Sequence, residues 1–129
     1  MKFSLETTAD KNYIQSYGPD HIVITSDSHS ESVQITESII LGPEQIISDR
    51  AARTDLKLDE SDISLLKSLE PELVIFVSDP TISPLSPEIV VAFTADAIGI
   101  ECMSLPAACR TYNLLVTEGR RVFLLINFL

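Results

Sequence analysis

The first half of the chain alternates short runs of β-branched and aliphatic residues with polar breaks. Ser, Asp, Gly and Pro separate the runs, which are HIVIT, SVQIT, SIIL and QIIS, all between residues 21 and 48. Short apolar runs between turn residues are typical of strands joined by turns. The pattern therefore predicts an antiparallel meander, with a hairpin loop at residues 26–32 and another turn in LGPEQ, residues 41–45.

After Arg53 the hydrophobic positions change to helical spacing. Asp59 is the predicted N-cap of a helix whose apolar positions recur every three residues, and Pro71 ends this helix. The next segment, LVIFV at residues 73–77, is apolar on both faces. Such a segment suits a strand that is covered by helices above and below.

The remainder of the chain predicts two further helices, each followed by a strand. Ser86 and Pro87 are a cap and a first helical residue, and IGIECM, starting at Ile98, follows as a strand. A helix is expected over residues 106–118, with Ser104 as the candidate cap of its first turn, Gly119 as its stop and RVFLLINF as the last, buried strand. Strands that alternate with helices in this way pair in parallel through right-handed crossovers.

These elements predict an α/β fold in a single domain, residues 1–129, with a central mixed β-sheet flanked by helices. An N-terminal antiparallel meander precedes a βαβαβ half. At 14.2 kDa and 45% hydrophobic residues, the chain is large and apolar enough for one buried core.

Composition restricts the possible partners. Nineteen acidic residues stand against nine basic ones, which gives a net charge of -10 and disfavours a nucleic-acid partner. The longest apolar run is far shorter than the roughly 20 residues of a membrane-spanning helix, so the protein is not expected to be membrane-embedded. The N-terminus has no signal or transit pattern, which predicts a cytoplasmic protein. Cys102 and Cys109 match no zinc or CxxC spacing, so we expect neither a metal, a cofactor nor a disulfide.

Candidate chemistry is concentrated at the predicted start of the last helix. Cys109 lies near the positive end of the helix dipole, which can activate a thiol, but no histidine is spaced to serve as its base, and its alanine neighbours favour a small buried residue in close helix packing. Arg110 is a candidate for binding an anionic ligand or the carboxylate of a partner. Arg120 and Arg121 are interpreted as interacting with the helix C-terminus and with acids such as Glu118.

Two further residues of this helix have polar groups that need partners. Tyr112 is expected to face inward and either to reach a crevice or to bond a backbone carbonyl. Asn113 disfavours the middle of a helix and must find partners if it is buried. A separate candidate site is the proline-rich loop of residues 78–87, where Asp79 and Thr81 follow the carboxyl end of a predicted strand. This loop lacks glycine, which disfavours a nucleotide site.

The stretch IGIECMSLPAACRTYNLLVTEGRRV, residues 98–122, resembles the C-terminal signature of a small α/β domain family. This family includes mitochondrial complex I assembly factor three and uncharacterised bacterial relatives. The resemblance implies a central mixed sheet flanked by helices, no established catalytic activity, and a noncatalytic accessory role that depends on protein partners. Where family members often have a Gly-Thr-Gly-like turn, this chain has Ser78, Asp79 and Pro80, which implies a changed crevice.

Three hypotheses follow for the function. The first is an uncharacterised accessory protein that binds protein partners, such as those of a respiratory or other membrane complex. The second is an enzyme or a binder of small molecules or anions that uses a site around Cys109 and Arg110. In the third, the polar residues of the signature only fix the last helix to the sheet. The sequence leaves the oligomeric state open.

Overall fold

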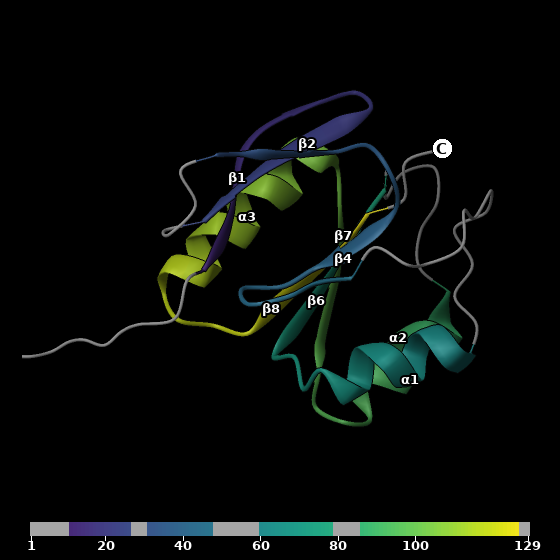
Figure 1. Ribbon diagram of the computed structural model, residues 1–129. Helices are drawn as coiled ribbons and strands as arrows, with labels where there is room; N and C mark the ends of the chain where they lie inside the picture. Colours follow the sequence, from purple (N-terminus) through teal and green to yellow (C-terminus); the bar gives the residue numbers. More distant parts are fainter. Residues whose placement is uncertain (1–10, 27–30, 48–59, 79–85, 127–129) are drawn as a thin grey trace, which may run out of the picture.

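The computed structural model describes residues 11–26, 31–47, 60–78 and 86–126, which contain eight strands and three helices (Figure 1). In chain order these are β1 (Asn12–Gly18), β2 (His21–Ser26), β3 (Val33–Ile35), β4 (Ile39–Leu41), β5 (Ile46–Ile47), α1 (Glu60–Ser68), β6 (Leu73–Val77), α2 (Pro87–Thr94), β7 (Gly99–Met103), α3 (Leu105–Thr117) and β8 (Val122–Ile126).

Five strands form the central sheet, in the order β5-β4-β8-β6-β7. β6 is parallel to both of its neighbours, so that Val74 lies between Ile100 of β7 and Phe123 of β8. β4 is antiparallel to β8, with Ile40 opposite Leu125. The predicted central mixed sheet is therefore confirmed, as is the parallel pairing of its second half.

Alternate side chains of a strand point to opposite faces of the sheet. The central strands are apolar at successive positions, so both faces of the sheet are apolar, and helices cover each of them. On one face Phe123 and Leu125 pack with Leu66 of α1 and Phe93 of α2. On the other face Leu124 packs against α3. Figure 1 shows α1 and α2 together on one side of the sheet, and α3 with β1 and β2 on the other.

A smaller antiparallel sheet, in the order β1-β2-β3, packs over α3. Its inner face contributes Ile14, Ile22 and Ile24 to the same apolar cluster as Cys109 and the inner face of the central sheet. Helix α3 contacts β1 as well as β6 and β8. The last helix is thus the element that joins the two sheets.

The N-terminal meander is confirmed, but its membership differs from the prediction. β1 was not predicted, whereas the predicted strands SIIL and QIIS form β4 and β5 of the central sheet. The reason is burial: β2 is alternately buried along its length, while Ile39, Ile40 and Leu41 are all buried. A strand that is apolar on both faces needs cover on both, and only the central sheet provides it.

The predicted helix starts can be compared where the residues are described. Ser86 caps α2 and its hydroxyl accepts a hydrogen bond from the Ile89 amide, with Pro87 as the first helical residue, as predicted. Gly119 ends α3 with a φ of 78°, a left-handed conformation that glycine adopts without strain. The Asp59 cap and most of the loop at 26–32 lie outside the described residues.

Candidate functional site

The start of α3 departs from the predicted capping. Ser104 occupies the N-cap position with an extended backbone, but its side chain makes no capping hydrogen bond. The Ser104 carbonyl accepts from the Ala108 amide at 2.8 Å, and Pro106 stands in the first turn, where its missing N–H costs no helical hydrogen bond. The predicted side-chain cap at Ser104 is therefore wrong, although the helix starts where expected.

Cys109 faces the core, not solvent. It is only 2% exposed and packs in the cluster between α3 and the two sheets. Burial raises the pKa of its thiol to about 11, because a thiolate is poorly solvated there, and the nearby charge of Arg110 only partly opposes this rise. A thiol with this pKa is protonated at neutral pH, so the geometry favours packing over nucleophilic chemistry.

The two cysteines should therefore differ in their reaction with a thiol reagent. Cys102 is half-buried, whereas a pKa near 11 in place of about 9 lowers the thiolate fraction of Cys109 at neutral pH by about 100-fold. We expect native protein to be labelled at Cys102 only, and Cys109 to react after denaturation or as the pH approaches 11. Mass spectrometry of wild type and Cys102→Ala measures this. Rapid labelling of folded Cys102→Ala at pH 7 would contradict it.

Tyr112 and Asn113 hold strand β1 through its backbone. The Tyr112 hydroxyl donates to the Asn12 carbonyl at 3.0 Å, which is the backbone anchor foreseen as one of its two outcomes. The Asn113 side chain accepts from the Ile14 amide and donates to the Ile14 carbonyl, both at 2.8 Å. The Asn113 carboxamide thus presents one acceptor and one donor, as a neighbouring strand would.

This contact explains an asparagine in the middle of a helix. β1 lies at the edge of its sheet, so the backbone groups on its open side have no strand to pair with. Asn113 occupies that open side at Ile14, next to an irregularity in the β1–β2 register between Ile14 and Ser16. Burial also raises the pKa of Tyr112, which keeps its hydroxyl a hydrogen-bond donor.

Sequence reasoning missed β1 and hence the partner of Tyr112 and Asn113. The signal was present in the tetrapeptide YGPD, residues 17–20, which contains the turn that separates β1 from β2. The strand itself, NYIQSYG, has a single buried residue, Ile14, and so its hydrophobic pattern is weak. The structure pairs Asn113 with a segment 99 residues away in the chain, which no local pattern could indicate.

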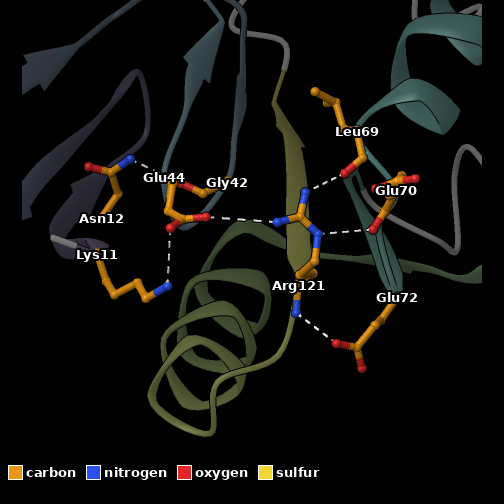
Figure 2. Close-up of polar contacts among 8 residues, drawn as sticks. All are labelled: Lys11, Asn12, Gly42, Glu44, Leu69, Glu70, Glu72 and Arg121. Atoms are coloured by element: carbon orange, nitrogen blue, oxygen red, sulfur yellow. Dashed lines mark hydrogen bonds and ion pairs between the residues drawn. The ribbon is translucent and has the colours of Figure 1, made fainter. Parts of the chain in front are cut away.

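Arg121 joins three elements at the amino end of β8 (Figure 2). Its guanidinium donates to the carbonyl of Leu69 and, at 3.0 Å, to the carbonyl of Glu70, both just beyond α1. It also lies 3.8 Å from a carboxylate oxygen of Glu44 in the β4–β5 turn, and 5.5 Å from the centre of the Phe123 ring. Arg121 therefore serves as a structural cap for α1.

The interpretation of Arg120 and Arg121 needs one correction. The two arginines do interact with a helix C-terminus and with acidic residues, as predicted. The helix, however, is α1 and not α3, and the acidic residues are Glu72 and Glu44 and not Glu118. Arg120 pairs with Glu72 at 2.7 Å. The Arg121 amide and then Arg120 lower the pKa of Glu72, because both donate hydrogen bonds to its carboxylate.

The chain also forms a close turn beside Arg121, at Gly42. A Cβ at this position would lie 2.3 Å from the ring of Phe123, so only glycine fits there without displacing the ring. Asn12 donates its side-chain N–H to the Gly42 carbonyl at 3.0 Å (Figure 2). Its backbone amide donates to the Pro43 carbonyl. The β4–β5 turn is thereby attached to both β1 and β8.

Arg110 differs from Cys109, Tyr112 and Asn113 because it is exposed. Lys11, Lys67, Arg120 and Arg121 all form ion pairs, and Arg110 is the cation without one among the Lys and Arg side chains of the described ranges. One turn further along α3, Leu114 is 59% exposed. The exposed face of α3 therefore combines an unpaired positive charge with an apolar side chain.

The second candidate site is only partly visible. β6 and β7 end side by side, where the Ser78 hydroxyl lies 3.1 Å from the Cys102 thiol. Asp79 and Thr81 lie outside the described residues. Cys102 pairs with Phe76, which faces α1 and α2, whereas Cys109 lies on the other side of the sheet, and both thiols are free.

The structure thus separates the predicted site residues. Cys109 and Tyr112 are buried, Asn113 binds β1, and Arg110 faces solvent. Within residues 11–26, 31–47, 60–78 and 86–126, no group of His, Cys, Asp or Glu side chains is placed to hold a metal ion. No helix of this part of the chain is long and apolar enough to cross a membrane.

Comparisons with known proteins agree with this fold. A family model described as "Protein of unknown function (DUF498/DUF598)" matches residues 14–126. A crystal structure from Bordetella parapertussis has 28% identity and a TM-score of 0.74, and the alignment covers 92% of this chain and 97% of that one. No curated protein matches the chain.

Two solution structures show the same fold at lower identity. A protein from Xanthomonas campestris is 24% identical, with a TM-score of 0.73 and coverage of 91% of this chain and 84% of that one. A Bordetella pertussis protein, described as a Mth938-like domain, is 23% identical, with a TM-score of 0.65 and coverage of 99% and 92%.

Proposed function

Since the chain belongs to the DUF498/DUF598 family of proteins of unknown function, we propose that it is a noncatalytic accessory protein that acts by binding other proteins. The observation that carries this proposal is a difference among the polar residues of the signature, residues 98–122. Cys109, Tyr112, Asn113 and Arg121 are engaged within the fold, whereas Arg110 is exposed and has no ion-pair partner in the described ranges. Arg110 is therefore the contact residue.

The chemistry of Arg110 suggests what the partner presents. An arginine guanidinium binds carboxylates through two parallel hydrogen bonds, and an apolar side chain beside it adds buried area. Leu114 supplies that apolar neighbour. The expected partner surface is therefore a carboxylate next to an apolar residue, and the Arg110–Leu114 face of α3 is its docking site.

The resemblance of residues 98–122 to the family that includes mitochondrial complex I assembly factor three supports an assembly role. We therefore include respiratory and other membrane complexes among the candidate partners, with this protein acting from the cytoplasm. The raised pKa of Cys109 and the wide separation of the polar side chains weigh against the alternative of an enzyme at α3.

The proposal is tested by capture from native extract with the tagged protein as bait. Arg110→Gln should reduce recovery of the partner about fivefold or more, since about 1 kcal/mol of binding free energy corresponds to roughly that factor. Lys67→Gln is the matched control, because it removes the same charge from α1, where Lys67 forms an ion pair with Asp96, a residue just beyond the end of α2. Equal recovery by both variants, or no reproducible partner for the wild type, would overturn the proposal.

A further inference from the structure

The exposed face of α3 carries a row of three side chains, four residues apart. The row consists of Arg110, Leu114 and the C-cap residue Glu118, and all three are exposed. Residues four apart form one of the ridges by which helices pack against each other. This ridge places a positive charge at one end, an apolar residue at its centre and a negative charge at the other end.

Neither charge of the ridge is paired within the described chain. Arg110 and Glu118 are eight residues apart, about 12 Å along the helix axis, so they cannot reach each other. The cations that follow Glu118, Arg120 and Arg121, bind Glu72 and Glu44. Glu118 also stands at the negative end of the α3 dipole, where a carboxylate is unfavourable unless a cation approaches it.

We propose that the partner of this ridge is a second copy of the same chain, with the two α3 helices packed antiparallel about a two-fold axis near Leu114. Arg110 and Glu118 each lie four residues, about 6 Å, from Leu114. The two-fold operation therefore brings Arg110 of each copy opposite Glu118 of the other and brings the two Leu114 side chains together. The proposal goes beyond the proposed function, because it assigns a second copy of this chain to the Arg110 face and does not require a different protein as partner.

Self-complementarity is the reason for choosing a second copy over an unrelated protein. A two-fold interface uses the same patch on both subunits, so residue i must match residue j and j must match i. Opposite charges at equal distances from a central leucine meet that condition. The contact involves one helix from each copy and belongs to the class of interfaces below about 1,200 Å², so the dimer should be weak and concentration-dependent.

Two charge reversals test the pairing in purified protein. Arg110→Glu places Glu opposite Glu at both pairs of a self-dimer, and Glu118→Arg places Arg opposite Arg. Sedimentation velocity over a concentration series should show that the wild type self-associates and that each variant raises the dissociation constant at least about tenfold. Circular dichroism checks that each variant is folded, and Glu37→Arg, an exposed change away from α3, is the matched control.

Mixing the two variants gives the decisive result. In a mixed dimer the two substituted side chains, one acidic and one basic, face each other at one contact, and the unchanged Arg110 and Glu118 face each other at the second. The mixture should therefore associate more tightly than either variant does alone. The double variant Arg110→Glu/Glu118→Arg should self-associate like the wild type. If net charge alone governed association, Glu118→Arg would associate more strongly than the wild type, because it reduces the net charge of -10.

A wild type that stays monomeric at every concentration, or a mixture that does not associate, would overturn the second-copy proposal. These failures are distinct from failure of the accessory role. If purified protein is monomeric but Arg110→Gln loses a captured partner, the dimer is wrong and the accessory role stands. If the charge-reversal variants, their mixture and the double variant associate as expected, but extract yields no other protein, the dimer stands and the accessory role is wrong.

Discussion

Replacement of Asn113 by Ala is expected to lower the free energy of unfolding by about 3 kcal/mol. The variant removes both hydrogen bonds to the backbone of Ile14 and leaves an amide and a carbonyl without partners at the part-buried edge of β1. Each such group costs about 1–3 kcal/mol, whereas the better helix propensity of Ala returns only about 0.6 kcal/mol. Denaturant unfolding measures the loss.

The matched control for Asn113→Ala is Thr117→Ala on the same helix. Thr117 is exposed and donates its hydroxyl to the Asn113 carbonyl of its own helix, so its removal should change stability by less than about 0.5 kcal/mol. Hydrogen exchange adds a local readout, because the Ile14 amide should exchange faster in Asn113→Ala. Equal stability of the two variants would show that the contact with β1 contributes little.

Replacement of Arg121 by Met should cost about 2 kcal/mol. Methionine keeps much of the apolar stem beside Phe123 but loses the donors to the Leu69 and Glu70 carbonyls and the charge facing Glu44. Hydrogen bonds that involve a charged group contribute about 1.5–3 kcal/mol each to stability. The carbonyls left at the end of α1 can form some hydrogen bonds with water, which keeps the expected loss near the lower part of that range.

Arg120→Met provides the control for Arg121→Met, because the same change occurs one residue away. Arg120 makes an exposed ion pair with Glu72, and such pairs contribute about 0–1 kcal/mol. Thermal unfolding of the two variants should therefore differ clearly, with Arg121→Met the less stable. If both variants lose the same small amount, Arg121 is an ordinary surface charge and not a cap for α1.

The two contacts give a physical account of the signature in residues 98–122. Tyr112 and Asn113 attach the small sheet to α3, and Arg121 attaches α1 and the β4–β5 turn to β8. Each acts largely on backbone carbonyls and amides, so it does not depend on the side chains of its partner segment. Stability of the two-sheet arrangement therefore explains these polar residues without any catalytic task.

The candidate site was less predictable than the fold. Inward packing of Cys109 and Tyr112 followed from helical spacing and agrees with the structure. The exposure of Arg110 matches its choice as a contact residue, which stays a prediction. The partners of Asn113, Arg120 and Arg121 could not be foreseen, because each lies 48 residues or more away in the chain.

The sequence by itself determined the alternation of helices and strands in the second half, the start of α2 at Ser86, the stop of α3 at Gly119 and the burial of β8. These features depend on interactions within a few residues or on the period of apolar positions, and both can be recognised from a short stretch of sequence. The tertiary structure alone decided that β4 and β5 belong to the central sheet and not to the meander, and that β1 binds α3. Those choices depend on which surface covers an apolar face and which distant group satisfies a backbone N–H or carbonyl, and such partners meet only after the chain has folded.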